Sequence, residues 1–195
     1  MSSHVPSPAV LQGVAFRVTS PRYRDLRRTA EITRHPESHG RFNTAEFGAV
    51  YVSREPGTAC QELRRRLARA GEDLERVHPR SIFVLDVHLH VVADIRTAKS
   101  LELWGLTADD VKGDEMERCQ EMAAVATRLG YEAVRWNAAT GAGESLALYI
   151  DQLIPDSQVR IAAEHPLTRE MLSELQGGTE VTVLIPELLC YSLLP

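Results

Sequence analysis

The segment GRFNTAEFGAVYVSREPGTACQEL, residues 40–63, contains a predicted strand, a turn and the start of a predicted helix in close succession. The β-branched and aromatic residues of Gly48–Ser53 predict the strand. A Pro-Gly pair then stops any earlier helix, and Thr58 with Gln61 matches a capping box, so a helix is expected from about Thr58. Apolar residues recur along that helix at helical spacing, at Ala59, Leu63, Leu67 and Ala70.

Outward from this segment, strands and helices interleave along the chain. A short strand is predicted at Val14–Val18, before a long loop over residues 19–40. Residues 81–95 alternate apolar and polar side chains, which is typical of a long strand with one exposed face. A helix is predicted between Asp114 and Gly130. The remaining predicted elements are strands at Ala133–Trp136, Ser145–Ile150 and Val159–Ala162, and a helix over Leu167–Gln176.

We expect a single α+β domain around a central mixed sheet. The 195 residues suit one domain over residues 14–195, with the polar, Pro-rich residues 1–13 as a flexible arm. No apolar run approaches the roughly 20 residues that cross a bilayer, and no secretory signal is recognisable. Three separated cysteines match neither a disulfide framework nor a zinc motif. These features predict a cytoplasmic protein that does not contact membranes.

Charge is unevenly distributed along the chain. The net charge is −5, yet residues 1–80 carry 14 Arg against nine acidic residues, whereas residues 81–195 carry eight basic against 18 acidic residues. An acidic whole argues against a nucleic-acid-binding protein. The Arg-rich first half is suited to a compact anion, because clustered positive charge concentrates anionic ligands.

An ordered set of short motifs runs through that first half. Arg17 lies on the first predicted strand, Gly40-Arg41-Phe42-Asn43 forms a turn, Tyr51 lies on the next strand and Glu62 on the helix after it. This order resembles the RES domain, a family named after its Arg, Glu and Ser. The resemblance covers roughly residues 14–175. Further dipeptides and tripeptides are similar to one branch of the family, namely Trp104-Gly105-Leu106, Asp109-Asp110, Gly113-Asp114 and Cys119-Gln120.

The resemblance implies an NAD+-degrading enzyme. RES proteins are toxins of bacterial toxin–antitoxin pairs that cleave the nicotinamide–ribose bond with phosphate or water as acceptor, and their fold is similar to that of ADP-ribosyltransferase toxins. The implied partner is a helix-turn-helix antitoxin that occludes the active site. NAD+ is then a substrate and inorganic phosphate a co-substrate, with neither a bound cofactor nor a metal expected.

The residue types suit this chemistry. Departure of neutral nicotinamide develops positive charge on the ribose, which the carboxylate of Glu62 is expected to stabilise. Arg17 and Arg41 are expected to bind the pyrophosphate, because a guanidinium donates two parallel hydrogen bonds. Tyr51 is expected to stack on the nicotinamide or ribose while its hydroxyl orients a phosphate or water. Asn43 is expected to bind the carboxamide or to fix the turn, and Glu62, Arg41 and Tyr51 together form the predicted catalytic group.

Two positions depart from the family pattern. The family Ser is expected where Ala138 stands, and Ser145 follows about seven residues too late, which leaves Thr140 as the nearest hydroxyl. Val18 stands where the related branch has an aromatic residue. One wall of the nicotinamide site is therefore expected from another aromatic residue, Phe42 or Trp136. Two other functions stay open on the same residues: transfer of ADP-ribose to a macromolecule, and a catalytically inactive module kept for binding its antitoxin.

The remaining features are interpreted as structural. Asp86, His88 and His90 share one strand face without a fourth metal ligand, so a solvent face or a partner contact is expected. Gly141-Ala142-Gly143 is too short for a dinucleotide-binding loop and is expected to be a turn. Arg64–Arg66 are expected to form a solvated helix face. The apolar segment Val181–Leu194 is expected to add a strand to the core or to form a subunit interface, which leaves a homodimer open.

Overall fold

The computed structural model describes residues 6–73, 75–139 and 143–192. Its strands form a closed ring in the order β1, β2, β5, β4 and β3, because β1 pairs with both β2 and β3, and β6 adds to β3. Only β3 and β4 run parallel among these pairs, so the sheet is mixed as expected. The strands are β1 (Ala9–Thr19), β2 (Val50–Ser53), β3 (Arg80–Asp94), β4 (Ala133–Asn137), β5 (Glu144–Leu148) and β6 (Gln158–Leu167).

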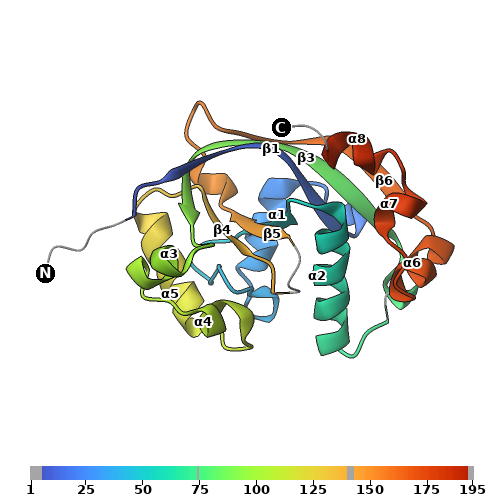
Figure 1. The fold of residues 1–195 in the computed structure, drawn as a ribbon, viewed down its shortest axis with the longest axis horizontal. Coiled ribbons are helices and arrows are strands. Elements are labelled where there is room, and N and C mark those ends of the chain that lie inside the picture. Colours follow the sequence, from blue (N-terminus) through green and yellow to red (C-terminus); the bar gives the residue numbers. More distant parts are fainter. Residues whose placement is uncertain (1–5, 74, 140–142, 193–195) are drawn as a thin grey trace, which may run out of the picture.

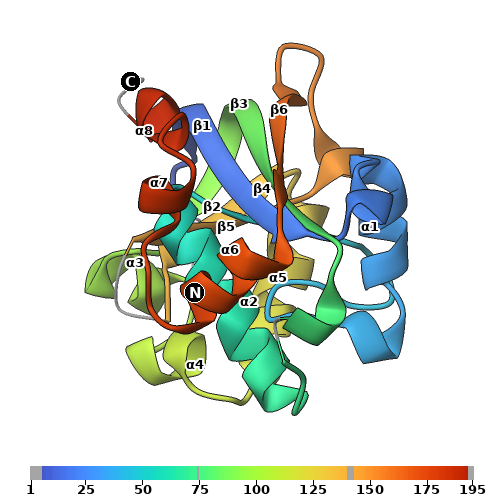
Figure 2. The same ribbon diagram turned by 90° about the vertical axis from the view of Figure 1, so that its right-hand side faces the viewer.

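Helices surround the strands in separate groups (Figures 1 and 2). The C-terminal helices α6 (Arg169–Gln176), α7 (Val181–Leu184) and α8 (Leu188–Ser192) lie on the side of β6, next to α2 (Pro56–Arg69). A second group consists of α3 (Ala98–Leu103), α4 (Ala108–Lys112) and α5 (Glu117–Arg128), and α1 (Leu26–Thr33) stands apart from both. Short 3-10 turns occur at Pro21–Tyr23, Pro36–Ser38, Glu75–Val77 and Ile150–Gln152.

The buried apolar residues form three clusters, one for each layer of the fold. The first fills the inside of the ring and takes side chains from all five of its strands, among them Leu11, Val52, Leu85, Ala133 and Leu146. The second joins α2 to the outer face of β1 and β3 and to the C-terminal helices, through Phe16, Leu63, Leu67, Val84, Leu172 and Leu188. The third lies beneath α4 and α5, with Cys119, Met122 and Ala126 packed on Val134 and Trp136.

Two elements begin earlier than expected. β1 begins at Ala9, because residues 9–13 extend the antiparallel ladder with β3 and are therefore strand rather than arm. α2 begins at Pro56, since a proline at the first helical position lacks only an N–H that would have no partner there. Glu55 is the N-cap residue, and the predicted capping box at Thr58 does not form: the Thr58 hydroxyl donates to Glu55 Oε2 at 3.2 Å.

The expected alternation along β3 is correct for only part of the strand. From Ser81 to Leu85 both faces are buried, because the ring interior covers one face and α2 with the C-terminal helices covers the other. Farther along, Asp86, His88 and His90 are half-buried as the pattern predicts. Val91 does not share a face with Leu89, since it packs on the cluster beneath α4 and α5 instead of inside the ring.

The C-terminal elements also depart in part from expectation. α5 begins at Glu117 rather than Asp114, and its C-cap residue is Leu129, whose side chain is exposed. Gly130 ends the helix as predicted, with a φ of +80° that favours glycine. The apolar tail forms α7 and α8 instead of a strand, because its buried residues recur at helical spacing, at Val181, Ile185 and Leu188. No helix in the described part of the chain is long and apolar enough to cross a membrane.

A buried carboxylate that the sequence did not single out binds β3 between Leu89 and Val92, where the register of its pairing with β1 shifts. Glu132 has no exposed surface, and its Oε2 accepts the N–H groups of His90 and Val91 at 2.8 and 2.9 Å. Its Oε1 accepts the N–H of Ile154 at 3.0 Å. Burial raises the pKa of Glu132, but the Ser157 side chain and these backbone N–H groups favour the charged form, outweigh burial and hold the pKa below its ordinary value.

Replacing Glu132 by Gln is expected to lower the free energy of unfolding by about 1–3 kcal/mol, because the amide NH2 faces a backbone donor that has lost its acceptor. Since the folded-state pKa is lowered, the carboxylate stabilises the fold above its unfolded pKa of about 4.3 and loses this effect as the pH falls through the folded pKa. Urea unfolding below about pH 4.3 should therefore show a loss of stability in the wild type that Glu132→Gln lacks. Parallel pH profiles for the two proteins would contradict this role.

Candidate functional site

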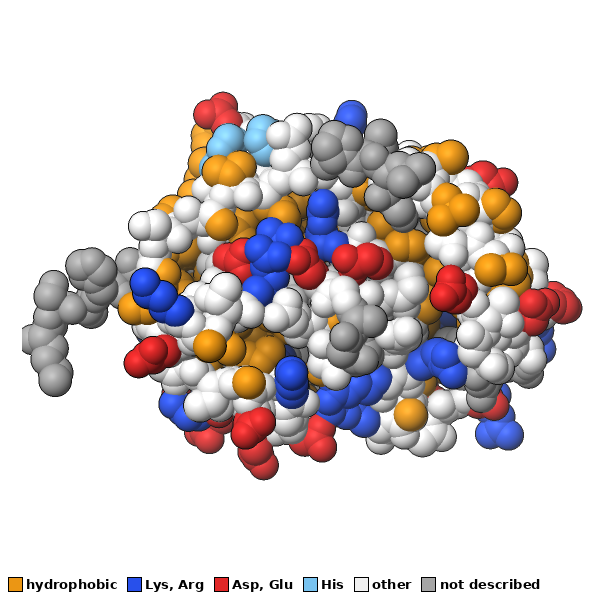
Figure 3. Space-filling model, viewed as in Figure 1, with side chains coloured by type: hydrophobic (Ala, Val, Ile, Leu, Met, Phe, Trp, Pro, Cys, Tyr) orange, Lys and Arg blue, Asp and Glu red, His pale blue; other side chains and the backbone are white. Residues whose placement is uncertain are grey.

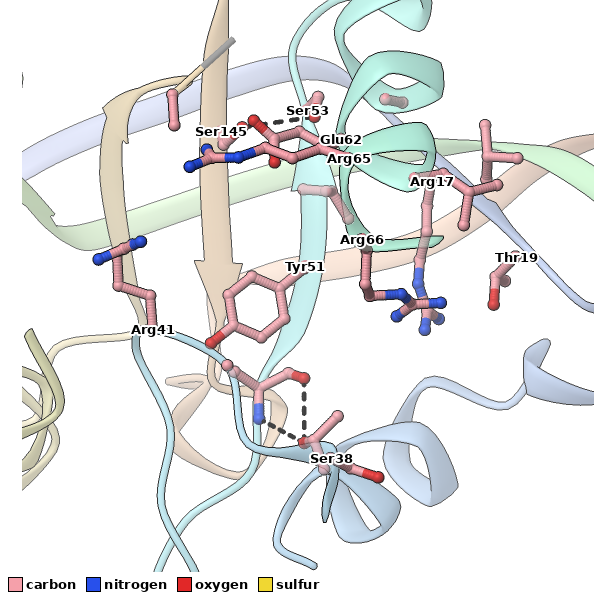
Figure 4. A pocket seen from close by; sticks show the side chains of 18 of the residues that line it. Arg17, Thr19, Ser38, Arg41, Tyr51, Ser53, Glu62, Arg65, Arg66 and Ser145 are labelled. Carbon is pink, nitrogen blue, oxygen red and sulfur yellow. Dashed lines mark hydrogen bonds between the residues drawn. The ribbon is translucent and has the colours of Figure 1, made fainter. Parts of the chain in front are cut away.

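One cavity of ≈ 290 Å³ brings together four of the predicted site residues, Arg17, Arg41, Tyr51 and Glu62 (Figure 4). Its walls come from β1, the turn after α1, β2, α2 and the paired strands β4 and β5. Glu62 is the one carboxylate among the described residues that line it. Five guanidinium groups line it as well, those of Arg17, Arg41, Arg65, Arg66 and Arg69. The cavity is therefore strongly positive, with a single acidic group.

Helix α2 places Glu62 because its two faces have different partners. Leu63 and Leu67 are buried against the strands, while Glu62 points into the cavity, toward the side that Ser53 and Ser145 line (Figure 4). The start of α2 is tied to β5 by two hydrogen bonds, Glu144 N–H to Glu55 Oε2 at 3.1 Å and Arg54 N–H to Glu144 O at 2.9 Å. The position of the carboxylate is thus set by packing below the helix and by hydrogen bonds at its end.

A group of charged side chains at the molecular surface supports the paired strands β4 and β5. Glu144 forms ion pairs with Arg96 and Arg135, and both arginines also pair with Asp94. Figure 3 shows basic and acidic side chains in contact near the centre of this face. Because these four residues belong to β3, β4, β5 and the segment after β3, their contacts hold the β4–β5 hairpin in place behind the cavity.

Arg17 is a half-buried cation with neutral partners. Its Nη1 donates to the carbonyl of Tyr23 at 3.3 Å and to Thr29 Oγ1 at 3.5 Å. Within the described residues no carboxylate forms an ion pair with it. Burial, and then the neighbouring Arg66, lower the pKa of Arg17 to about 10, so the group remains charged at neutral pH. Arg17 is therefore a charged group that neutral acceptors hold at the wall of the cavity.

The Gly40–Asn43 turn and Tyr51 hold each other through a closed set of hydrogen bonds. The Tyr51 hydroxyl accepts the N–H of Phe42 and donates to Asn43 Oδ1, both at 2.8 Å. Asn43 Oδ1 also accepts the N–H of Gly40 at 2.8 Å, and Asn43 Nδ2 donates to Thr33 O at 2.5 Å. A Cβ at Gly40 would lie 2.4 Å from the Tyr51 hydroxyl, so only glycine fits there.

The structure corrects the expected role of the Tyr51 hydroxyl and selects one of the two expected alternatives for Asn43 and for the aromatic wall. The Tyr51 hydroxyl donates its one hydrogen to Asn43 and so has none left to donate to a phosphate, although its ring lines the cavity; burial raises its pKa well above the ordinary value. The Asn43 side chain is fully buried and fixes the turn rather than binding a carboxamide. Phe42 is fully buried too, with its ring centroid 4.6 Å from that of Trp136. Of the two aromatic residues predicted for the wall, it is Trp136 that lines the cavity.

Arg41 is largely committed to the protein. Its Nη1 donates to the carbonyls of Asp110 and Glu115 at 2.7 and 2.9 Å, and its Nη2 donates to that of Gly113. These carbonyls belong to α4 and to the connection from α4 to α5. Arg41 is therefore a residue that positions this connection against the Gly40–Asn43 turn. Both of its terminal nitrogens already donate to carbonyls, so they do not form the free pair of donors that was expected to bind pyrophosphate.

Ser145 lines the cavity, although it lies about seven residues after the position expected for the family Ser. Ser145 lines the wall on β5, directly opposite Trp136 on β4, and its Oγ lies 3.5 Å from that of Ser53. Ala138 is buried, and the predicted substitute Thr140 lies outside the described residues, as do Gly141 and Ala142. The antiparallel pairing of β4 with β5 brings Ser145 beside the end of β4, so its separation along the chain does not keep it from the site.

Two residues of the predicted solvated face of α2 belong to the cavity wall, whereas His88 and His90 on β3 do not. Arg65 and Arg66 line the cavity, and Arg64 does not. His88 and His90 are neighbours on β3, with ring centroids 4.6 Å apart, and neither lines the cavity. Among the residues that the structure describes, no group of three or more His, Cys, Asp or Glu side chains is placed to hold a metal ion.

The family model of the RES domain matches residues 14–170, most of the chain. The protein belongs to the RES-domain family. Its RES domain is 27% identical over 141 residues to proteins named NAD(+) phosphorylase MbcT from Mycobacterium tuberculosis H37Rv and Mycobacterium bovis, which covers 71% of this chain and 75% of theirs.

A solved structure shares the fold of this RES domain. The crystal structure of the M. tuberculosis MbcT-MbcA toxin-antitoxin complex matches with a TM-score of 0.76 at 24% identity, over 87% of this chain and 92% of that chain. The match agrees with the expected single domain with a mixed sheet and is consistent with an ADP-ribosyltransferase-like fold. The C-terminal helices α7 and α8 and most of α6 lie beyond the part matched by the family model.

Replacing Tyr51 by Phe is expected to lower the free energy of unfolding by about 1–3 kcal/mol, because the Phe42 N–H and Asn43 Oδ1 both lose a buried partner. Urea unfolding followed by circular dichroism measures the change. Tyr191→Phe, at a half-buried tyrosine of α8, is the matched control and should leave the unfolding midpoint nearly unchanged. A Tyr51→Phe protein as stable as the wild type would contradict the structural role of the hydroxyl.

Proposed function

We propose that this RES protein is a toxin enzyme that degrades NAD+ by cleaving the nicotinamide–ribose bond, with inorganic phosphate or water as acceptor. The observation that carries the proposal is a positive cavity in which Glu62 is the one carboxylate among the described lining residues. A dinucleotide brings a negatively charged pyrophosphate for the guanidinium groups and a developing ribosyl cation for Glu62. The relatives named NAD(+) phosphorylase support phosphate as the acceptor.

The chemistry follows from where charge develops. The bond between C1′ of the ribose and the nicotinamide nitrogen breaks with its electron pair moving to nitrogen, so nicotinamide leaves neutral and C1′ becomes electron-poor. Glu62 stabilises that charge. An oxygen of the phosphate dianion then forms the new bond to C1′, which gives a phosphorylated ADP-ribose without removal of a proton. With water as acceptor a proton must leave, and Glu62 is the carboxylate placed to take it.

We propose in addition that a helix-turn-helix antitoxin is the protein partner and that the pair acts in the cytoplasm. The solved structure with the same fold is that of a toxin-antitoxin complex, which supports an antitoxin as the class of partner. The positive cavity favours a partner that presents acidic or polar side chains to it, because opposite charges steer association.

Glu62→Gln is expected to reduce the rate of NAD+ consumption by at least about 100-fold, because the neutral amide cannot stabilise the ribosyl cation. The assay follows nicotinamide release by chromatography, with and without phosphate, and a thermal melt checks that the variant is folded. Phosphate-dependent release indicates phosphorolysis, and phosphate-independent release indicates hydrolysis. Labelled ADP-ribose on protein would replace the proposal with ADP-ribosyl transfer. No release under any condition would indicate a catalytically inactive binding module.

Ser145→Ala is expected to lower kcat for NAD+ cleavage by about tenfold, a loss typical of one hydrogen bond to a charged group. The physical reason is that Ser145 offers a hydroxyl in the cavity wall toward which Glu62 points. Ala138→Ser serves as the comparison, since the buried Ala138 does not line the cavity, and it should not raise kcat. An unchanged kcat in Ser145→Ala would exclude this role for the hydroxyl.

A further inference from the structure

Helix α2 carries an arginine, Arg66, that lines the cavity together with Glu62. Arg66 follows Glu62 by four residues, so the two side chains lie on the same face of the helix, about 6 Å apart along its axis. Both line the cavity. Figure 4 shows the guanidinium of Arg66 beside that of Arg17, at the end of the cavity away from Glu62. Arg66 is exposed and Arg17 half-buried, so the pair reaches from the surface into the cavity.

Three of the five cavity arginines are already engaged by the protein. Arg41 donates to three backbone carbonyls, Arg65 donates to the carbonyl of Lys112 at 3.1 Å, and Arg69 forms an ion pair with Asp114. For Arg66 the described part of the chain offers neither an ion pair nor a side-chain hydrogen bond, and for Arg17 it offers neutral acceptors alone. Arg66 is therefore the cavity arginine that no described side chain or carbonyl engages, and Arg17 beside it is a half-buried cation with neutral partners.

The pair is electrostatically unsatisfied as it stands. The charge of Arg66 disfavours the charge of Arg17, which burial disfavours already. An anion between the two groups would relieve this repulsion and accept hydrogen bonds from both planar forks. The Thr19 hydroxyl, on a largely buried residue at the end of β1, lines the same part of the cavity and adds a further donor.

We propose that Arg66 and Arg17 form a paired-guanidinium subsite for the pyrophosphate of the dinucleotide, with Arg66 as a binding residue of the RES site. The inference rests on the proposed function, because it assumes a substrate with a pyrophosphate. Position within the cavity favours pyrophosphate over the acceptor phosphate: the acceptor must reach C1′ beside Glu62, whereas a ribose separates the pyrophosphate from C1′. One helix then carries both the group that stabilises the ribosyl cation and a group that binds the pyrophosphate, so substrate binding fixes C1′ relative to Glu62.

The test measures ADP-ribose binding by calorimetry, since ADP-ribose keeps the pyrophosphate and lacks the nicotinamide that is cleaved. Arg66→Ala is expected to weaken ADP-ribose about tenfold, and Arg66→Lys, which keeps the charge without the fork, should recover part of the loss. The matched control is Arg64→Ala, which removes the same charge from α2 outside the cavity and should change affinity less than about twofold. Nicotinamide riboside, which has no phosphate, should bind Arg66→Ala and wild type alike.

Steady-state kinetics separate the two sources of phosphate. Arg66→Ala is expected to raise KM for NAD+ with KM for inorganic phosphate unchanged. A rise in KM for phosphate alone would assign Arg66 to the acceptor and overturn the proposal, as would wild-type affinity of Arg66→Ala for ADP-ribose or an equal loss in Arg64→Ala. If the protein does not consume NAD+ but binds ADP-ribose through Arg66, the proposed function fails while the pyrophosphate subsite stands.

Discussion

The long antiparallel pairing of β1 with β3 is the constraint on which the rest of the structure depends. It runs from Ala9 opposite Val92 to Thr19 opposite Ser81, with one register shift after Ala9, and it closes the ring of strands. Closure creates an enclosed apolar interior, and it leaves the outer faces of β1 and β3 to be covered by α2 and the C-terminal helices. The cavity lies where α2 meets the ends of β1 and β2, so two neighbouring strands of the ring and the helix packed on it form its walls.

Polar groups around the cavity divide into those that the protein satisfies and those that it leaves for a ligand. Asn43, the Tyr51 hydroxyl and most of Arg41 have their hydrogen-bonding capacity filled by backbone and side chains. Burial makes an unpaired polar group costly, which is why a turn of this kind is built from mutually satisfied residues. By contrast, the exposed side chain of Arg66 has no hydrogen bond or ion pair among the described residues, and Arg17 beside it has neutral partners; both line the cavity. Arg66 belongs to none of the sequence motifs, so it is the structure that indicates its role.

Much of the fold and the centre of the site could be predicted from local patterns. The strand–turn–helix order around Gly40–Glu62 and the glycine that ends α5 follow from side-chain type and spacing. The same spacing predicts the buried Ala59, Leu63 and Leu67 of α2, whereas Ala70 is the exposed C-cap residue. Predictions failed where a residue had two roles open to it. The Tyr51 hydroxyl can bind either a substrate or the backbone of a turn, and its residue type does not tell which. Ser145 is separated from the end of β4 along the chain, but the pairing of β4 with β5 places the two side by side.

The sequence by itself determined the family, the mixed α and β architecture and the positions of Arg17, Tyr51 and Glu62 in a shared site, because the order of short motifs along a chain does not depend on how the chain packs. Only the tertiary structure decided which polar atoms remain available to a ligand. That outcome depends on hydrogen bonds between residues far apart in the chain, such as Arg41 with Asp110, and no local pattern encodes them. It also decided that the apolar tail is helical and packs beside α2, because its burial depends on a surface formed by distant strands.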